Sequence, residues 1–199
     1  MSRPARYAKG LAKREEILST ALDVIARTGY GRTSVRELAS AVGLSQAGLL
    51  HYFASKEQYG QALLESYFDD YLADLDYLLG NPAIPARERL LRYWQRWLQS
   101  QGDDCQEQKC LVVKLSAEVA DLSDAMRLTL RDGTDRIVDR LAACITAGIG
   151  DGSIAATAPR ETAQTLYQLW LGASLLAKLH RTRTPLEGAM AFTHQALAP

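Results

Sequence analysis

The chain has 199 residues, of which 47% are hydrophobic and 23% are charged, and its formal net charge is zero. This composition is typical of a globular protein that buries a core without metals or disulfides. No apolar run approaches the roughly 20 residues that span a bilayer. The three cysteines fit no metal-site spacing, and no signal peptide is expected. We therefore expect a cytoplasmic protein without a membrane role, a metal or a cofactor.

The charge is unevenly distributed along the chain. Residues 1–56 carry nine lysines and arginines against four acidic residues, an excess of five positive charges that the remainder balances. A basic N-terminal region followed by an acidic remainder is typical of a protein that binds a phosphate backbone through its N-terminal region. Chance is the alternative explanation for a difference of this size.

Apolar residues recur at helical spacing along almost the whole chain, without sustained period-two alternation, which predicts an all-α fold. The first helix is expected over residues 9–28 and ends at Gly29. A short second helix follows, capped by Thr33 or Ser34, with Glu37 able to close a capping box.

Gly43 ends the second helix after two turns and can adopt the positive φ of a tight turn. Ser45 caps a third short helix that runs to about Tyr52. Ser55 opens a long fourth helix that reaches Leu79. Five further helices are expected over residues 85–101, 106–120, 124–148, 160–181 and 186–197.

Two short helices around a glycine turn indicate a helix-turn-helix, whose second helix enters the major groove of DNA with its N-terminus first. Gln46 lies at that end and is our best candidate for a base contact, because its amide reaches base edges. The alternative is a helical hairpin packed in a core. The pattern favours an N-terminal three-helix DNA-binding domain over residues 1–54 and a larger helical sensor and dimerisation domain over 55–199.

The segment from Thr33 to Glu57 resembles the N-terminal signature of the TetR family of repressors. The shared features, in order, are a threonine, an apolar residue followed by alanine, a glycine turn ending in serine, an aromatic pair and Ser-Lys-Glu. The resemblance implies that the threonine, aromatic and lysine positions contact phosphates. It also implies that the N-terminus of the third helix faces the DNA groove. The implied DNA-binding residues are Thr33, Ser45, Gln46, Ala47, Gly48, His51, Tyr52 and Lys56. The family usually has tyrosine where this chain has Leu50, so His51 or Tyr52 is expected to take over that phosphate contact.

Family members dimerise through their last two long helices, which implies a homodimer here through residues 160–181 and 186–197. A two-fold dimer presents two recognition helices to palindromic double-stranded operator DNA. The expected apolar face consists of Leu166, Leu169, Trp170, Ala173, Leu176 and Ala177. The alternative is that this face is buried within one subunit.

Two segments, residues 109–127 and 166–179, are similar to the sensor domain of TetR-family repressors that respond to reactive electrophiles and oxidants through a cysteine. Cys110 matches that cysteine and Lys178 matches a sensor-domain lysine. A sensing thiol must be partly thiolate, and a nearby ammonium lowers its pKa. The alternatives are a small buried hydrophobic cysteine and a lysine whose amine reaches water.

Two rival functions remain to be weighed. An enzyme with Cys110 as nucleophile and His180 as base lacks the third group such a site needs, so we do not expect an enzyme. A repressor relieved by a non-covalent lipophilic or aromatic inducer is the main alternative to an electrophile sensor. Its candidate pocket residues are Trp94, Trp97, Met126 and Trp170, although residues at this helical spacing are often simple core.

Overall fold

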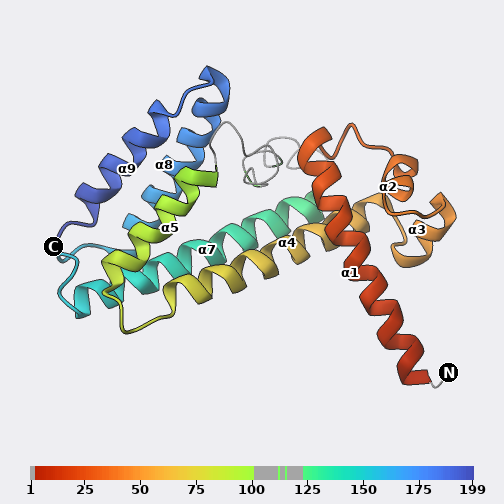
Figure 1. Ribbon diagram of the computed structural model, residues 1–199, viewed down its shortest axis with the longest axis horizontal. Helices are drawn as coiled ribbons and strands as arrows, with labels where there is room; N and C mark the ends of the chain where they lie inside the picture. The colour runs from red at the N-terminus through yellow and green to blue at the C-terminus, as the bar shows by residue number, and fades with distance from the viewer. Residues whose placement is uncertain (1–2, 101–111, 113–114, 116–122) are drawn as a thin grey trace. The chain divides into compact units, whose positions relative to one another are not determined.

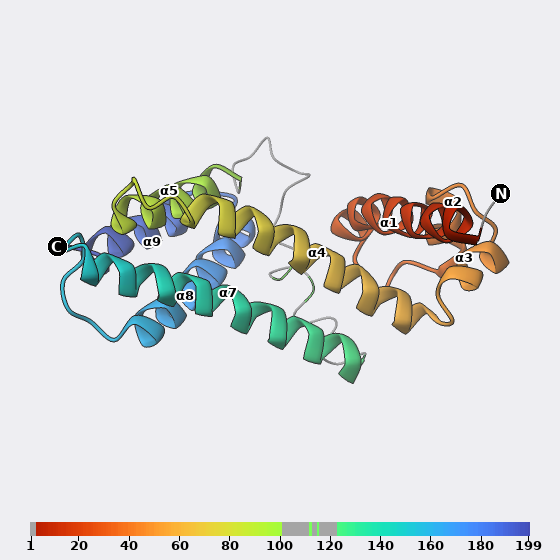
Figure 2. The ribbon, with the colours of Figure 1, turned by 90° about the horizontal axis from the view of Figure 1, so that it is seen from below.

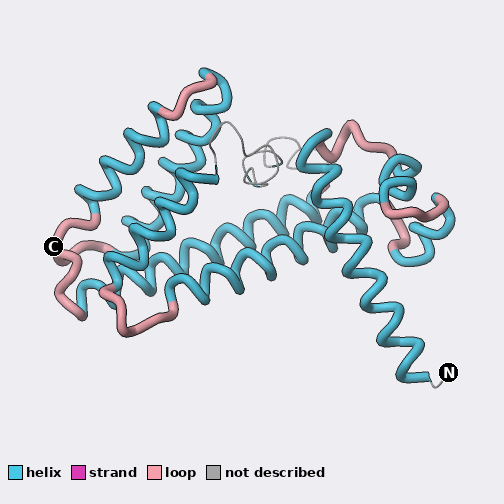
Figure 3. Tube along the Cα trace, viewed as in Figure 1, coloured by secondary structure: helices cyan, strands magenta, loops and turns pink. Residues whose placement is uncertain are grey.

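The computed structural model describes residues 3–100, 112, 115 and 123–199. Helices joined by loops make up this part of the chain, which contains no strand (Figure 3). The all-α prediction is therefore confirmed. The helices are α1 (Arg3–Thr28), α2 (Val35–Ala41), α3 (Gln46–Tyr52), α4 (Lys56–Leu79), α5 (Ala86–Ser100), α7 (Asp124–Gly150), α8 (Pro159–His180) and α9 (Thr184–Ala196) (Figure 1). The helix expected over residues 106–120 falls mostly outside the described residues.

The chain forms two compact units. The first consists of Met1–Asp69 and Cys110–Arg131, and the second of Asp70–Lys109 and Asp132–Pro199. Helices α4 and α7 each contribute residues to both units. The domain boundary expected after residue 54 follows the sequence motif, whereas the compact units divide within these two long helices.

The first unit is built around α1, α2 and α3, which lie together in Figure 2. Helix α1 begins at Arg3 rather than at residue 9, because Pro4 is compatible with the first turn of a helix and does not delay its start. Its apolar stripe and the inner faces of α2 and α3 are buried. This core includes Ile17, Leu18, Ala21, Ile25, Leu38, Ala39, Leu49 and Phe53.

In the second unit, α8 and α9 lie side by side and α5 packs against α9 (Figure 1). Its core contains a cluster of three buried tryptophans. The rings of Trp94 and Trp170 stack with centroids 5.0 Å apart and planes 16° from parallel. Trp97 lies against both, at 5.7 and 6.1 Å. Aromatic pairs at these separations stabilise a core beyond their buried area.

The apolar face predicted for dimerisation was partly wrong. Leu166, Trp170 and Ala173 are buried within the second unit, which corresponds to the alternative that this stripe belongs to a single subunit. Leu176, a member of the predicted face, is exposed, as are the large apolar residues Leu175, Leu179 and Phe192 of α8 and α9. Because α8 is apolar on more than one side, its sequence periodicity does not distinguish the face packed inside from the face left to solvent.

Candidate nucleic-acid interface and sensor residues

Helix α2 begins with the capping box that the sequence predicts. The backbone N–H of Glu37 donates to the hydroxyl oxygen of Ser34 at 3.2 Å, and the backbone N–H of Ser34 donates to the Glu37 carboxylate at 2.7 Å. The hydrogen bond from the Ser34 backbone is the main reason that the pKa of Glu37 lies below its usual value, with the Ser34 side chain second. Two N–H groups that a helix start leaves without partners are satisfied in this way.

Gly43 makes the turn between α2 and α3, with φ of +68°. A side chain is strained in this left-handed conformation, so glycine is the natural residue here. The backbone N–H of Leu44 reaches back to the carbonyl of Ala39 at 2.8 Å and closes the end of α2. The predicted glycine turn is confirmed.

Ser45 caps α3, as expected, by accepting the backbone N–H of Gly48 at 3.0 Å. The other side chains of this short helix divide into a buried side, with Leu49, and a solvent-facing side. Gln46, Ala47, Leu50 and His51 are exposed, while Gly48 and Tyr52 are half-buried. Three of the predicted DNA-binding residues, Gln46, Ala47 and His51, are therefore open to solvent, and Ala47 and His51 have the i, i+4 spacing of one helix face.

The end of α3 is held by aromatic contacts. The rings of His51 and Tyr52 meet edge to face at 5.6 Å. Phe53 is buried, and the guanidinium of Arg14 lies 5.0 Å from its ring centroid. Arg14 thus brings a positive charge from α1 to the end of α3, a cation–π contact that sequence spacing does not reveal.

The structure does not favour the phosphate contact expected of Thr33. Its side chain is 3% exposed, and its hydroxyl donates to the carbonyl of Gly29 at 2.6 Å while lying 2.8 Å from the hydroxyl of Thr28. A phosphate oxygen needs a donor, and the proton of Thr33 is already used inside the turn. Thr33 therefore shapes the connection between α1 and α2.

Lys56, at the start of α4, is held by Tyr30. Its ammonium donates to the carbonyl of Tyr30 at 3.0 Å and lies 4.6 Å from the ring centroid. In return, the hydroxyl of Tyr30 donates to the carbonyl of Lys56 at 2.7 Å. Burial, followed by the nearby charge of Glu57, raises the pKa of Tyr30 to about 12. An ammonium has three N–H donors, so one contact to Tyr30 leaves others available for a phosphate.

The predicted sensor residues are placed only in part. Cys110 lies outside the described residues, as do Cys105, Lys109 and Lys114. Lys178 is exposed on α8, which corresponds to the alternative of a lysine whose amine reaches water. Cys144 is buried, its thiol 3.6 Å from the carbonyl of Ala86. Burial raises the pKa of Cys144 to about 11, which is typical of a cysteine that belongs to the core.

The four residues predicted to line an inducer pocket belong to two different compact units. The three tryptophans cluster in the second unit, where Trp97 donates to Ser174 and Trp170 donates to Thr193. Within the described residues, the indole N–H of Trp94 is buried without a hydrogen-bond partner. Met126 belongs to the first unit, where its side chain packs beside Gly60 and Tyr30.

Sequence reasoning missed two residues of the candidate interface, one exposed on α3 and one buried beside Lys56. Leu50 was noted only as a lost tyrosine, yet its side chain is 39% exposed on the same face as Gln46 and His51. Tyr30 was not singled out, because its contact with Lys56 joins residues 26 positions apart. The available sequence signal for Leu50 was its position four residues after Gln46, which places both residues on the same side of a helix.

Two kinds of feature are absent from the described residues. No helix in this part of the chain is long and apolar enough to cross a membrane. Nor do its His, Cys, Asp and Glu side chains gather in any group of three or more that is placed to hold a metal ion.

Comparison with known proteins gives two family matches. Residues 17–62 match the model of bacterial regulatory proteins of the tetR family, and residues 86–193 match the tetracyclin repressor-like C-terminal domain. The transcriptional repressor NemR of Escherichia coli K12 is 34% identical over 186 residues, which cover 93% of this chain and 94% of NemR. The repressor DhaR of a Mycobacterium species is 28% identical over 187 residues, 94% and 92% of the two chains.

The fold agrees with these sequence matches. The crystal structure of reduced E. coli NemR superposes with a TM-score of 0.89 at 34% identity, covering 94% of this chain and 97% of NemR. Relatives in this family are transcriptional regulators and not enzymes, bind operator DNA and act as dimers. The chain belongs to the TetR family of bacterial regulatory proteins.

Proposed function

We propose that this chain is a cytoplasmic, homodimeric repressor that leaves its palindromic operator when a reactive electrophile or oxidant modifies Cys110. The single observation that carries the proposal is the similarity to NemR, which extends over nearly the full length of both chains. The solved NemR structure is described as its reduced form, which is consistent with a relative whose redox state matters. Cys110 and Lys178 occur in the two segments that resemble electrophile-responsive members of the family.

The DNA-binding half of the proposal assigns different tasks to two groups of residues. Gln46 is exposed near the N-terminus of α3 and would contact a base edge, with Ala47 and Gly48 small enough to let the helix approach. Lys56 would contact a phosphate, with His51 or Tyr52 supplying a second phosphate contact. These roles predict that Lys56→Ala weakens binding to all DNA and reduces its salt dependence, whereas Gln46→Ala relaxes base preference at one position.

The chemical half depends on the thiolate of Cys110. A thiolate attacks an electrophile such as N-ethylmaleimide, or is oxidised by hypochlorite to a sulfenic acid that condenses with a thiol or an amine. Lys178 is the amine we assign to this step: the sulfenic acid loses water as sulfur bonds to nitrogen. A covalent change at one residue is enough to release DNA if it favours the released dimer by a few kcal/mol.

The test is a gel-shift titration with the protein's own upstream DNA, before and after N-ethylmaleimide or hypochlorite, and again after a reductant. Wild type is expected to release DNA with either reagent, and reductant restores binding only after hypochlorite. Cys110→Ser should bind DNA and ignore both reagents. Cys144→Ser is the matched control and should respond as wild type. Release of DNA from Cys110→Ser would contradict the proposal, and Lys178→Gln tests the amine separately.

A repressor relieved by a non-covalent aromatic or lipophilic inducer is the second candidate. The buried N–H of Trp94, which has no partner within the described residues, favours it, because a ligand oxygen would satisfy that donor. The close stacking of Trp94 on Trp170 opposes it, because a ligand must separate the rings. DNA binding that is insensitive to thiol reagents but is released by an aromatic ligand that quenches tryptophan fluorescence would favour this candidate.

A further inference from the structure

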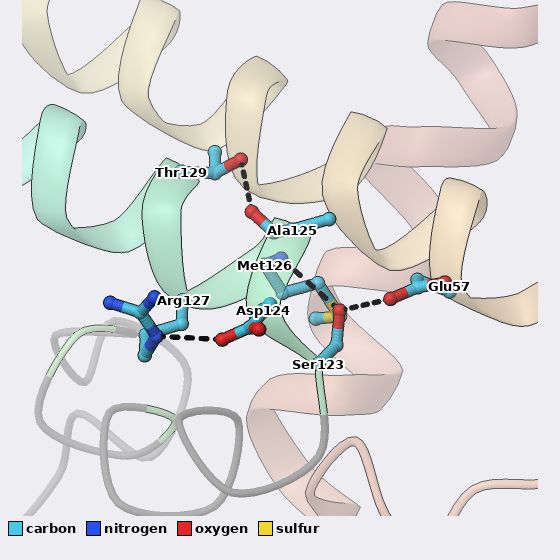
Figure 4. A network of polar contacts seen from close by, with 7 residues as sticks. All are labelled: Glu57, Ser123, Asp124, Ala125, Met126, Arg127 and Thr129. Atoms are coloured by element: carbon cyan, nitrogen blue, oxygen red, sulfur yellow. Dashed lines mark hydrogen bonds and ion pairs between the residues drawn. The ribbon is translucent and has the colours of Figure 1, made fainter.

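Ser123 joins the start of α7 to the start of α4. Its hydroxyl donates to a carboxylate oxygen of Glu57 at 2.5 Å and accepts the backbone N–H of Met126 at 3.2 Å (Figure 4). The hydroxyl oxygen of Ser123 therefore caps the start of α7, while the hydroxyl proton is donated to Glu57 in the first turn of α4. Both residues belong to the first compact unit, although 66 positions separate them in the sequence.

A second, apolar contact lies one turn further along both helices. Met126 is fully buried. A Cβ atom added to Gly60 of α4 would lie 2.6 Å from the sulfur of Met126 and 2.7 Å from the ring of Tyr30. With Met126 and Tyr30 in these positions, a side chain at residue 60 would displace at least one of them. The start of α7 thus touches α4 through one polar and one apolar contact.

The same turn of α4 carries Lys56. Its ammonium is held by the carbonyl and ring of Tyr30, and Tyr30 in turn packs against Gly60 beside Met126. Glu57 is the next residue and would attract this ammonium if its carboxylate were free. The hydrogen bond from Ser123 directs that carboxylate to α7. The ammonium of Lys56 is then held by Tyr30 and lies in the field of the Glu37 carboxylate, with N–H donors left for an incoming phosphate.

We propose that Ser123 and Glu57 are positioning residues for DNA binding, whose hydrogen bond holds the first turn of α4 so that Lys56 reaches an operator phosphate. The inference rests on the phosphate contact proposed for Lys56, but it names residues that touch no DNA. It differs from a simple packing role, because the contact acts through one defined ammonium and is measurable in the salt dependence of binding.

Replacing Glu57 distinguishes the positioning role from the electrostatic effect of removing a negative charge near the DNA. Removing a negative charge beside the DNA-binding face strengthens DNA binding by electrostatics alone. The positioning role predicts the opposite for Glu57→Ala, an approximately tenfold loss of operator affinity at constant salt, as expected for a lost hydrogen bond to a charged group. Glu57→Gln keeps the acceptor for Ser123 and should bind DNA at least as tightly as wild type. Tighter binding by Glu57→Ala would overturn the proposal.

Ser123→Ala removes the donor of the same hydrogen bond, and Thr129→Ala is its matched control. Thr129 lies on α7, where its hydroxyl donates to the carbonyl of Ala125 within the same helix. Ser123→Ala should lower operator affinity about tenfold, and Thr129→Ala should leave it unchanged. Denaturant unfolding of each dimer shows whether the variants are folded at the temperature of the binding assay.

A double-mutant cycle with Lys56→Ala decides whether the contact acts through the ammonium. If it does, Glu57→Ala weakens binding and reduces the salt slope in wild type, but has neither effect in Lys56→Ala. An equal loss in both backgrounds would overturn the positioning role while leaving the phosphate contact intact. If Lys56→Ala itself binds DNA with unchanged salt dependence, the phosphate contact of the proposed function fails, and the positioning role fails with it.

Discussion

The indole N–H of Trp97 donates to the hydroxyl of Ser174 at 3.0 Å, and both side chains are buried. The same hydroxyl donates to the carbonyl of Trp170 one turn earlier on α8. Ser174 therefore links the tryptophan of α5 to the backbone of α8 inside the second unit. Ser174 is needed in this core because it accepts the buried indole N–H of Trp97, which water cannot reach.

Ser174→Ala should consequently destabilise the protein by about 1–3 kcal/mol, the cost of leaving a buried donor unpaired. The measurement is urea unfolding at one fixed protein concentration, since dimer stability depends on concentration. Thr146→Ala is the matched control, because that exposed hydroxyl bonds only to a carbonyl of its own helix, and its loss should cost less than about 0.5 kcal/mol. Equal effects of the two substitutions would refute the importance of the Trp97 contact.

Cys144 should be inert in the native protein. Burial raises the pKa of its thiol to about 11, so almost no thiolate is present at neutral pH. The Cys105→Ser/Cys110→Ser double variant leaves Cys144 as the only thiol. A disulfide reagent that reports thiolate colorimetrically should find no reactive group in this variant when folded and one equivalent in denaturant. Rapid labelling of the folded variant would show that Cys144 competes with Cys110 as a sensor.

The same thiol predicts a loss of stability in alkali. The folded-state pKa of Cys144 lies above the ordinary value of 9, so the native state keeps a proton that the unfolded chain releases. Its contribution is complete below pH 9 and is lost as the pH rises through about 11, with a limiting slope of about 1.4 kcal/mol per pH unit for one proton. Unfolding free energies between pH 8 and 10 should fall in wild type and fall less steeply in Cys144→Ala. Parallel curves would contradict the assignment.

In acid, the capping box of α2 should lose its effect. The pKa of Glu37 is lowered by its hydrogen bonds with Ser34, so the folded state favours the carboxylate. This stabilisation is present above the ordinary pKa of 4.5 and is lost as the pH falls through the lower folded-state value. An NMR titration of Glu37 should give a midpoint below 4.5, which Ser34→Ala raises. Ser40→Ala, an exposed substitution in the same helix, should leave the midpoint unchanged.

The sequence predicted local structure well, because caps and turns depend on near neighbours. Ser34 with Glu37, the positive φ of Gly43 and the cap at Ser45 all follow from residue types within four positions. The all-α fold follows from apolar periodicity in the same way. Such signals are local and need no knowledge of how helices pack.

Contacts between distant segments could not be predicted from the sequence. Trp170 was assigned to an interface and instead stacks on Trp94 of α5. Met126 and the tryptophans are all apolar helix residues, and nothing in their spacing shows that they belong to different units. Each outcome depends on which helix covers which face, and periodicity identifies an apolar face without naming its partner.

Leu50 offers a final test of the DNA-facing surface. Its exposed side chain shares a face of α3 with Gln46, and an apolar residue on a recognition helix suits the methyl group of thymine. Replacing the contacted thymine with uracil removes only that methyl and should cost wild type about 0.8 kcal/mol, or roughly fourfold in affinity. A set of operators with each thymine replaced in turn locates the position. Leu50→Ala should be insensitive to this replacement, whereas Gln46→Ala should remain sensitive at the same base. If Leu50→Ala still distinguishes thymine from uracil there, another side chain contacts the methyl group, and α3 lies in the groove on a different face.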